Sequence, residues 1–194
     1  IAAILLQADA LYLDCFQIFV EPIERELGIR SSPEVGRSHA QQNRGYNSRI
    51  DAVNYSLLCD DGQGGKNLRE SDVILVGVSR CGKTPTCLFL AMQYGIKAAN
   101  YPLIPEDLER MRLPESLENF HKKLFGLTIM PNRLSSIRQE RRPNSVYASL
   151  ENCQNEVRKA EALVSQLGIP FLDTTTRSIE EVAAFILQKS KLKR

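Results

Sequence analysis

Residues 77 to 84 carry the one pattern in this sequence that is built to bind phosphate. They match the motif G-x-x-x-x-G-K-[ST] at every fixed position. In such a phosphate loop, successive backbone N–H groups and a helix N-terminus surround phosphate oxygens, and the lysine adds a mobile positive charge. The predicted nucleotide-binding residues are Gly77, Val78, Ser79, Arg80, Cys81, Gly82, Lys83 and Thr84.

The residues on either side of this motif supply the structural context that it requires. An apolar run at 73–76 predicts a buried strand before the loop, and residues 86–94 predict a helix that Gly95 ends. In this context Lys83 would neutralise transferred phosphate, and the Thr84 hydroxyl would bind Mg²⁺. The alternative is a glycine turn that only caps a helix.

Acidic residues near the loop could bind the metal ion or act as a base. A phosphate-loop enzyme commonly has a second apolar strand that ends in Asp, but the run at 124–129 is followed by Met130. Asp60 and Asp61 precede the phosphate-binding strand, and we predict that they are magnesium ligands or a base that accepts a hydroxyl proton. An Asp-Asp-Gly turn without catalytic function is the alternative.

A group of arginines follows the third predicted strand. Arg138, Arg141 and Arg142 lie at i, i+3 and i+4 of a predicted helix, and Arg133 precedes them. Guanidinium groups can bind phosphate oxygens bidentately, so Arg138 and Arg141 are predicted to act from a lid over the transferred phosphate. A solvated amphipathic helix explains the same spacing equally well.

Strands and helices alternate after residue 70, which predicts an α/β fold. Strands are expected at 73–78, 96–100, 124–129 and 169–172, and helices at 86–94, 133–142, 150–167 and 179–189. This order predicts a P-loop kinase-like parallel sheet covered by helices. Glycines at 62, 64 and 65 predict a hinge after a mostly helical N-terminal portion. We therefore predict a helical region at 1–70 and a nucleotide-binding domain at 71–194.

Composition excludes several classes of protein. The 194 residues include 25 Lys and Arg against 23 Asp and Glu, which is too small an excess to predict binding to nucleic acid or membrane. Five cysteines without a C-x-x-C pair argue against a disulfide framework and a zinc site, and they suit a reducing cytoplasm. The first twenty residues include Asp9 and Asp14, so neither a membrane span nor a signal peptide is expected, and the start at Ile1 suggests a truncated chain.

Strings along most of the chain resemble the pyruvate, phosphate/water dikinase regulatory protein family. The resemblance is carried by the residues at 77–86, 98–102, 123–129, 137–141 and 147–150 and by Asp60-Asp61-Gly62. It is closest to the bacterial branch, the phosphoenolpyruvate synthase regulatory proteins, whose members have a further N-terminal region that is missing from this chain.

This resemblance implies two opposite reactions in one cytoplasmic protein. The family transfers phosphate from ADP to a threonine of the dikinase and releases AMP, and it removes that phosphate with inorganic phosphate to give pyrophosphate. It implies phosphoenolpyruvate synthase as the partner and residues 77–84 as the ADP site. Roles for Mg²⁺, Asp60, Asp61 and the arginines come from chemistry alone, and a homo-oligomer is compatible with the sequence.

Two other functions fit the residues without the resemblance. A small-molecule kinase would phosphorylate a metabolite with ATP, and a nucleotide-sensing module would bind ADP and the dikinase without chemistry.

Overall fold

The computed structural model describes residues 7–8, 15–31, 44–60, 68–190 and 192, and these fall into two compact units, 1–42 and 43–194. The first unit contains helix α2 (Cys15–Leu27), in which Phe19, Ile23 and Leu27 recur every four residues and are exposed. These three side chains therefore share one face of the helix.

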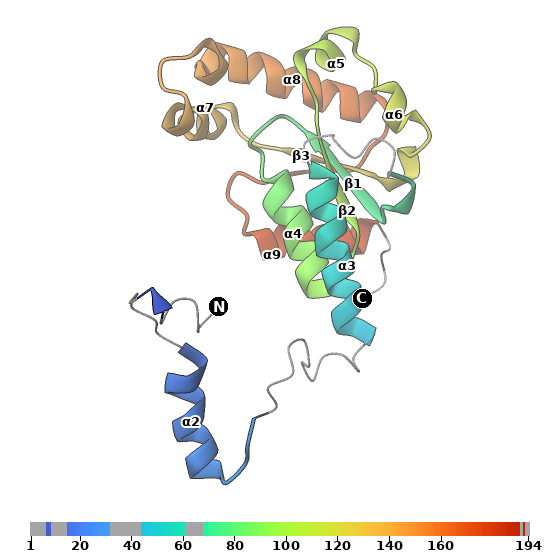
Figure 1. Cartoon of the computed structure of the whole chain (residues 1–194). Coiled ribbons are helices and arrows are strands. Elements are labelled where there is room, and N and C mark those ends of the chain that lie inside the picture. Colours follow the sequence, from blue (N-terminus) through green and yellow to red (C-terminus); the bar gives the residue numbers. More distant parts are fainter. Residues whose placement is uncertain (1–6, 9–14, 32–43, 61–67, 191, 193–194) are drawn as a thin grey trace. The chain divides into compact units, whose positions relative to one another are not determined.

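The second unit is an α/β structure with a four-stranded parallel sheet in the order β2-β1-β3-β4 (Figure 1). The strands are β1 (Val73–Gly77), β2 (Ala98–Pro102), β3 (Leu124–Thr128) and β4 (Phe171–Asp173). All four predicted strands are present, shifted by up to two residues at their ends. The predicted α/β fold with a P-loop kinase-like sheet is confirmed.

Helices link and cover these strands. They are α3 (Arg44–Leu58), α4 (Lys83–Tyr94), α5 (Pro105–Arg110), α6 (Glu115–Glu118), α7 (Pro131–Arg141), α8 (Leu150–Gln166) and α9 (Ile179–Lys189). Single 3₁₀ turns lie at η3 (Leu68–Glu70), η4 (His121–Lys123) and η5 (Val146–Ala148). Ser178 caps α9 with the capping box that its sequence encodes, and Ser149 caps α8.

The two central strands are buried on both faces of the sheet, because every residue of β1 and β3 is buried. Helices α4 and α9 lie on one side of the sheet and α8 on the other (Figure 1), and Phe125 of β3 contacts Phe185 of α9 edge to face. On the α8 side a Cβ at Gly126 would lie 3.5 Å from Val164 and only 2.7 Å from the Cβ of Phe171. Glycine at this position allows β4 and α8 to pack closely.

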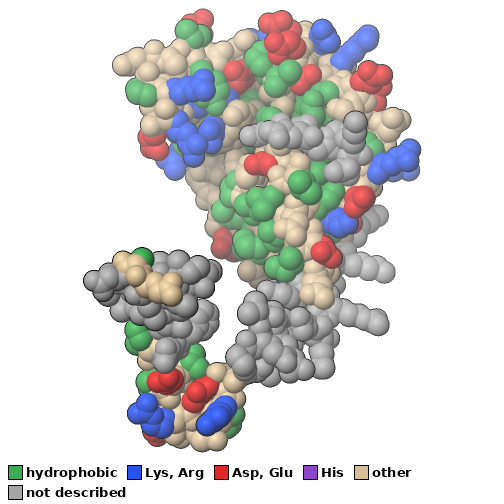
Figure 2. Space-filling model, viewed as in Figure 1, with side chains coloured by type: hydrophobic (Ala, Val, Ile, Leu, Met, Phe, Trp, Pro, Cys, Tyr) green, Lys and Arg blue, Asp and Glu red, His purple; other side chains and the backbone are tan. Residues whose placement is uncertain are grey.

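Helix α3 belongs with the second unit, because it packs against α4 and β2. The compact units therefore divide at 42/43, ahead of the boundary near residue 70 that the glycines predicted. Whether 1–70 and 71–194 are functional domains stays a prediction. Figure 2 shows hydrophobic side chains over α3 and α4, where Ile50, Leu57 and Met92 are exposed.

Candidate active site

The loop between β1 and α4 is held in shape by hydrogen bonds to its carbonyl oxygens. The Leu103 amide donates to Gly77 O, the Thr174 hydroxyl donates to Cys81 O at 3.0 Å, and the Thr86 hydroxyl donates to Gly82 O at 2.8 Å. A trans peptide whose carbonyl points into the protein directs its N–H the opposite way. The loop therefore presents N–H groups on its other side, as an anion-binding loop requires.

Two glycines allow the backbone of the phosphate loop to adopt this conformation. A Cβ on Gly77 would lie 2.1 Å from the carbonyl oxygen of Leu127, and Gly82 has φ 90° directly before α4. A side chain at the first position would collide with β3, and one at the second would be strained. The loop also contains Arg80 in the left-handed region, at φ 74°.

Lys83 lies at the first residue of α4 and its side chain curls over the loop. It is only 4% exposed, and its Nζ donates to the carbonyl oxygen of Val78 at 2.8 Å and lies 3.8 Å from Cys81 Sγ. The ammonium group is thus positioned over the loop by one hydrogen bond to a backbone carbonyl oxygen, and a phosphate oxygen can replace that carbonyl as the acceptor. Binding of phosphate by Lys83 stays a prediction of the sequence motif.

Thr84, Asp60 and Asn100 meet beside the loop. The Thr84 hydroxyl donates to Asp60 Oδ1 at 3.0 Å, and Asn100 Nδ2 donates to the same carboxylate oxygen and lies 2.9 Å from the Thr84 oxygen. Asp60 reaches this point from just beyond the end of α3, and Asn100 lies on β2, level with Leu75 of β1. Residues 24 and 16 positions apart in sequence are therefore brought into one polar cluster.

This cluster can accommodate a magnesium ion. Adjacent oxygen ligands of octahedral Mg²⁺, at about 2.1 Å from the metal, are separated by about 3.0 Å, the distance found between the Thr84 and Asp60 oxygens. Among the described residues, no group of three or more His, Cys, Asp or Glu side chains could hold a metal ion. The remaining ligands would be phosphate oxygens and water, as is usual for Mg²⁺ in nucleotide sites.

The sequence analysis did not predict Asn100, because the metal-binding residue at the end of an apolar strand in phosphate-loop enzymes is commonly acidic. The strand next to β1 on this side is β2, and it contributes the Asn100 amide. The carboxylate is that of Asp60, which lies just beyond the end of α3. The polar residue at the end of the 96–100 strand was the signal that could have identified Asn100. Asp61 lies outside the described residues, so its role stays a prediction.

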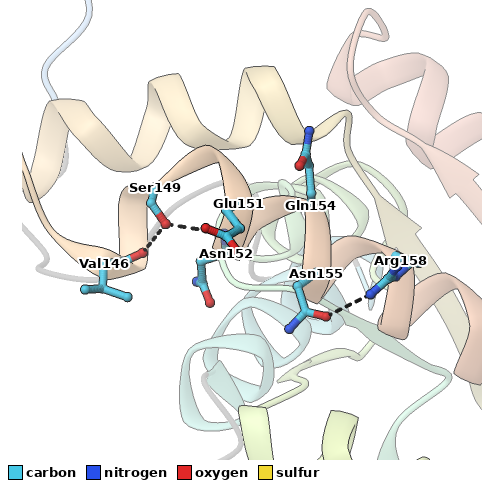
Figure 3. Close-up of a pocket in the computed structure, with 7 residues that line it drawn as sticks. All are labelled: Val146, Ser149, Glu151, Asn152, Gln154, Asn155 and Arg158. Carbon is cyan, nitrogen blue, oxygen red and sulfur yellow. Dashed lines mark hydrogen bonds between the residues drawn. The ribbon is translucent and has the colours of Figure 1, made fainter.

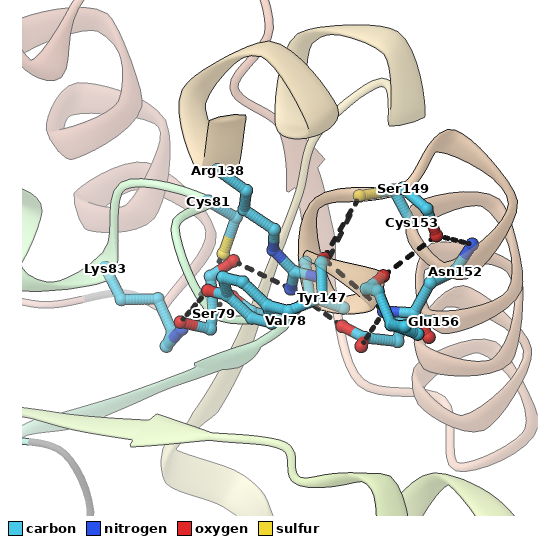
Figure 4. A network of polar contacts seen from close by, with 11 residues as sticks. Val78, Ser79, Cys81, Lys83, Arg138, Tyr147, Ser149, Asn152, Cys153 and Glu156 are labelled. Atoms are coloured by element: carbon cyan, nitrogen blue, oxygen red, sulfur yellow. Dashed lines mark hydrogen bonds and ion pairs between the residues drawn. The ribbon is translucent and has the colours of Figure 1, made fainter. Parts of the chain in front are cut away.

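Arg138 is part of a buried network and not of a mobile lid (Figure 4). Its side chain is 0% exposed; it forms an ion pair with Glu156 at 2.7 Å and donates to the carbonyl oxygens of Tyr147 and Ser79 at 3.0 and 3.2 Å. Its guanidinium also lies 4.0 Å from the centre of the Tyr147 ring, and the Tyr147 hydroxyl donates to Ser79 Oγ. Interpreting Arg138 as a lid residue that binds phosphate was wrong, because its guanidinium is enclosed by these contacts.

Arg141, by contrast, is exposed at the end of α7 and lines the hollow beside the loop. This hollow has a volume of about 580 Å³ and also contains Asp60, Lys83, Thr84 and Asn100. Arg138 and Arg141 are three residues apart on α7, but their side chains have different surroundings. Arg138 is buried, whereas Arg141 lines the hollow. Arg133 and Arg142 are also exposed.

The cysteines whose side chains the structure describes are buried free thiols. They are Cys59, Cys81, Cys87 and Cys153. Burial raises the pKa of the Cys87 thiol and that of Cys153, in the second case against the opposing effect of Arg138. Both thiols are therefore neutral near pH 7 and have structural rather than nucleophilic character.

A second hollow lies away from the phosphate loop, along α8 and η5 (Figure 3). Its charged side chains are Glu151 and Arg158, and Arg158 donates to Asn155 in the same wall. Because the hollow contains neither the loop nor the Thr84 cluster, the chemistry predicted from the sequence belongs to the first hollow.

The parallel sheet with a phosphate loop after β1 defines a P-loop kinase-like α/β protein. Residues 2–187 match the kinase/pyrophosphorylase family, and the chain belongs to this family. It is 58% identical over its whole length to a Polaromonas naphthalenivorans protein, of which it covers 71%, and 59% identical over 97% of its length to a Ralstonia nicotianae protein, of which it covers 68%. Both relatives are provisionally named phosphoenolpyruvate synthase regulatory proteins.

In the part of the chain that the structure describes, no helix has both the length and the apolar character needed to cross a membrane.

Proposed function

We propose that this protein is a cytoplasmic, bifunctional regulator of phosphoenolpyruvate synthase. It phosphorylates a threonine of the synthase with ADP and removes the same phosphate with inorganic phosphate. The supporting observations are the membership of the kinase/pyrophosphorylase family and the names of relatives 58–59% identical to this chain. The observation that carries the proposal is the Lys83 and Thr84 geometry at the phosphate loop, with Asp60 at the Thr84 hydroxyl.

In the forward reaction, the threonine oxygen of the synthase attacks the β-phosphorus of ADP. The bond from this phosphorus to the bridging oxygen breaks, AMP leaves with that oxygen, and the hydroxyl proton passes to a base. The loop N–H groups and Lys83 stabilise the negative charge on the transferred group, and Arg141 lies at the same hollow to add charge. Thr84 and Asp60 would bind Mg²⁺, which neutralises phosphate charge when bound.

In the reverse reaction, an oxygen of inorganic phosphate attacks the phosphorus of phosphothreonine. The bond to the threonine oxygen breaks, this oxygen regains a proton, and pyrophosphate forms. Asp61 remains a candidate base for the forward proton transfer. Asp60 is better suited to the metal, because its Oδ1 lies 3.0 Å from the hydroxyl of Thr84, the other proposed ligand.

One incubation tests this proposal against its rivals. The chain is mixed with phosphoenolpyruvate synthase, Mg²⁺ and ADP, and AMP and phosphothreonine are measured. We expect both products in equal amounts and inactivation of the synthase. Binding of ADP and the synthase without formation of AMP would identify a sensing module. Absence of phosphothreonine, together with turnover of a metabolite in a parallel incubation with ATP, would identify a small-molecule kinase.

A further inference from the structure

One contact of the Arg138 network reaches the phosphate loop through a side chain of the loop itself. The Tyr147 hydroxyl donates to Ser79 Oγ at 3.1 Å, across 68 positions of sequence (Figure 4). The phosphate-loop motif fixes two glycines, a lysine and Thr84, and it leaves residue 79 unspecified. The motif therefore does not explain why a hydroxyl at this position is held by a second hydroxyl.

Tyr147 has a well-defined position from which to hold it. Its carbonyl oxygen accepts from Arg138 Nη1 at 3.0 Å, and the centre of its ring lies 4.0 Å from Arg138 Cζ. The next residue of η5, Ala148, accepts from the Ser135 hydroxyl of α7 at 2.7 Å. The Ser79 backbone does not depend on the phenol, because Arg138 Nη2 already donates to the Ser79 carbonyl oxygen. What the phenol adds is a fixed side-chain rotamer of Ser79.

Ser79 lies on the side of the loop where the charged groups gather. It lines the hollow of about 580 Å³ together with Lys83, Thr84 and Arg141. Lys83 Nζ donates to the carbonyl oxygen of Val78, in the peptide that joins Val78 to Ser79. The ammonium group that would neutralise the transferred phosphate is thus placed at the peptide directly before Ser79.

The bond from Tyr147 leaves the Ser79 proton available for another acceptor. A serine hydroxyl can accept one hydrogen bond and donate another. Among the residues that the structure describes, the Ser79 hydroxyl has no partner besides Tyr147. A hydroxyl that accepts a hydrogen bond is polarised and becomes a stronger donor. A phosphate oxygen in the hollow would be a suitable acceptor for it.

We propose that the Ser79 hydroxyl donates to the phosphate that is transferred, the β-phosphate of ADP, and that Tyr147 is the positioning residue that orients this hydroxyl. The inference rests on the proposed function and adds one side-chain donor to the loop N–H groups and Lys83. The Ser79 proton stays on its oxygen throughout, and Ser79 forms no bond to phosphorus. Pyrophosphate offers the same pair of phosphates as ADP, whereas AMP lacks the β-phosphate.

Calorimetry with ADP, pyrophosphate and AMP tests this assignment. Ser79→Ala should weaken binding of ADP and of pyrophosphate on the order of tenfold each, and AMP affinity should stay unchanged. Ser79→Thr keeps a hydroxyl and should recover most of the lost affinity. Normal affinity of Ser79→Ala for ADP and pyrophosphate, or an equal loss for AMP, would overturn the inference.

A second set of variants tests the positioning role of Tyr147. Tyr147→Phe keeps the ring against Arg138, so Tm should change little while ADP and pyrophosphate affinity fall about threefold. Tyr94→Phe is the matched control, because Tyr94 is also half-buried and ends α4 far from the loop. In a Ser79→Ala background, Tyr147→Phe should cause no further loss of affinity. A further threefold loss in that background would show that Tyr147 does not act through Ser79.

The outcomes separate this inference from the proposed function. If binding follows the expected pattern but the synthase is not phosphorylated, the Ser79 contact stands and the proposed function fails. If the synthase is phosphorylated and Ser79→Ala binds ADP normally, the proposed function stands and the Ser79 contact fails. An unaltered chain that binds neither ADP nor pyrophosphate would overturn both.

Discussion

Removing Glu156 should destabilise the protein more than any surface substitution on α8, because it leaves the Arg138 charge buried without its ion-pair partner. The Arg138 side chain is 0% exposed and that of Glu156 is 16% exposed, so water cannot replace the lost carboxylate efficiently. Breaking a buried ion pair by deleting one partner costs about 3–5 kcal/mol. At about 2–4 °C per kcal/mol for a chain of this size, Glu156→Ala should lower Tm by about 6–20 °C.

The assay is urea unfolding of Glu156→Ala beside Glu151→Ala, an exposed carboxylate in the first turn of the same helix. Loss of Glu151 removes only an interaction with the helix N-terminus and should cost less than about 1 kcal/mol. A Glu156→Ala effect no larger than that of Glu151→Ala would refute the conclusion that the ion pair holds this region together.

A double variant separates stability from the position of the phosphate loop. Arg138→Met with Glu156→Leu replaces the pair by apolar side chains and should recover most of the stability that Glu156→Ala loses. It still removes the donor to the Ser79 carbonyl oxygen. We therefore expect the double variant to be well folded and to bind ADP with an affinity reduced on the order of tenfold. Normal ADP affinity would show that Arg138 does not position the loop.

Three further predictions concern the reacting groups. Lys83→Ala should lower ADP-dependent phosphorylation on the order of a hundredfold or more. The control is Lys97→Ala, which changes a lysine next to the opposite end of β2 and should leave phosphorylation nearly unchanged. Near-normal activity of Lys83→Ala would remove the loop from the mechanism. Asp60→Asn should lose most kinase activity with little change in Tm, since Asn keeps the turn but not the charge, and full activity would make Asp60 structural. Thr84→Val should raise the Mg²⁺ concentration needed for half-maximal rate, and an unchanged Mg²⁺ titration would exclude Thr84 as a ligand.

The sequence predicted the sheet well because its signals are local. The apolar run before Gly77 and the helix that Gly95 ends are both visible within a few residues, and both are present with small shifts. The capping box at Ser178 likewise places the start of α9 at the residue that the structure shows. These elements depend on nearest neighbours in sequence, which a single chain displays directly.

The site was only partly predictable because its contacts are long-range. Asn100 becomes a neighbour of Thr84 only through the order of strands in the sheet, which local patterns do not specify. Arg138 looked like a surface arginine because the sequence does not show that Glu156 and Tyr147 enclose it from α8 and η5. Burial of a charged side chain can be predicted only when the residues that pair with it are known.

Competition between inorganic phosphate and ADP tests the central claim, which is that both reactions use one phosphate site. The attacking phosphate of the reverse reaction and the phosphates of ADP require the same loop N–H groups and Lys83. Initial rates of ADP-dependent phosphorylation of the synthase should be measured at several phosphate concentrations. Phosphate should raise the apparent KM for ADP and leave kcat unchanged; a fall in kcat at constant KM would contradict the account and show that phosphate binds at a second site.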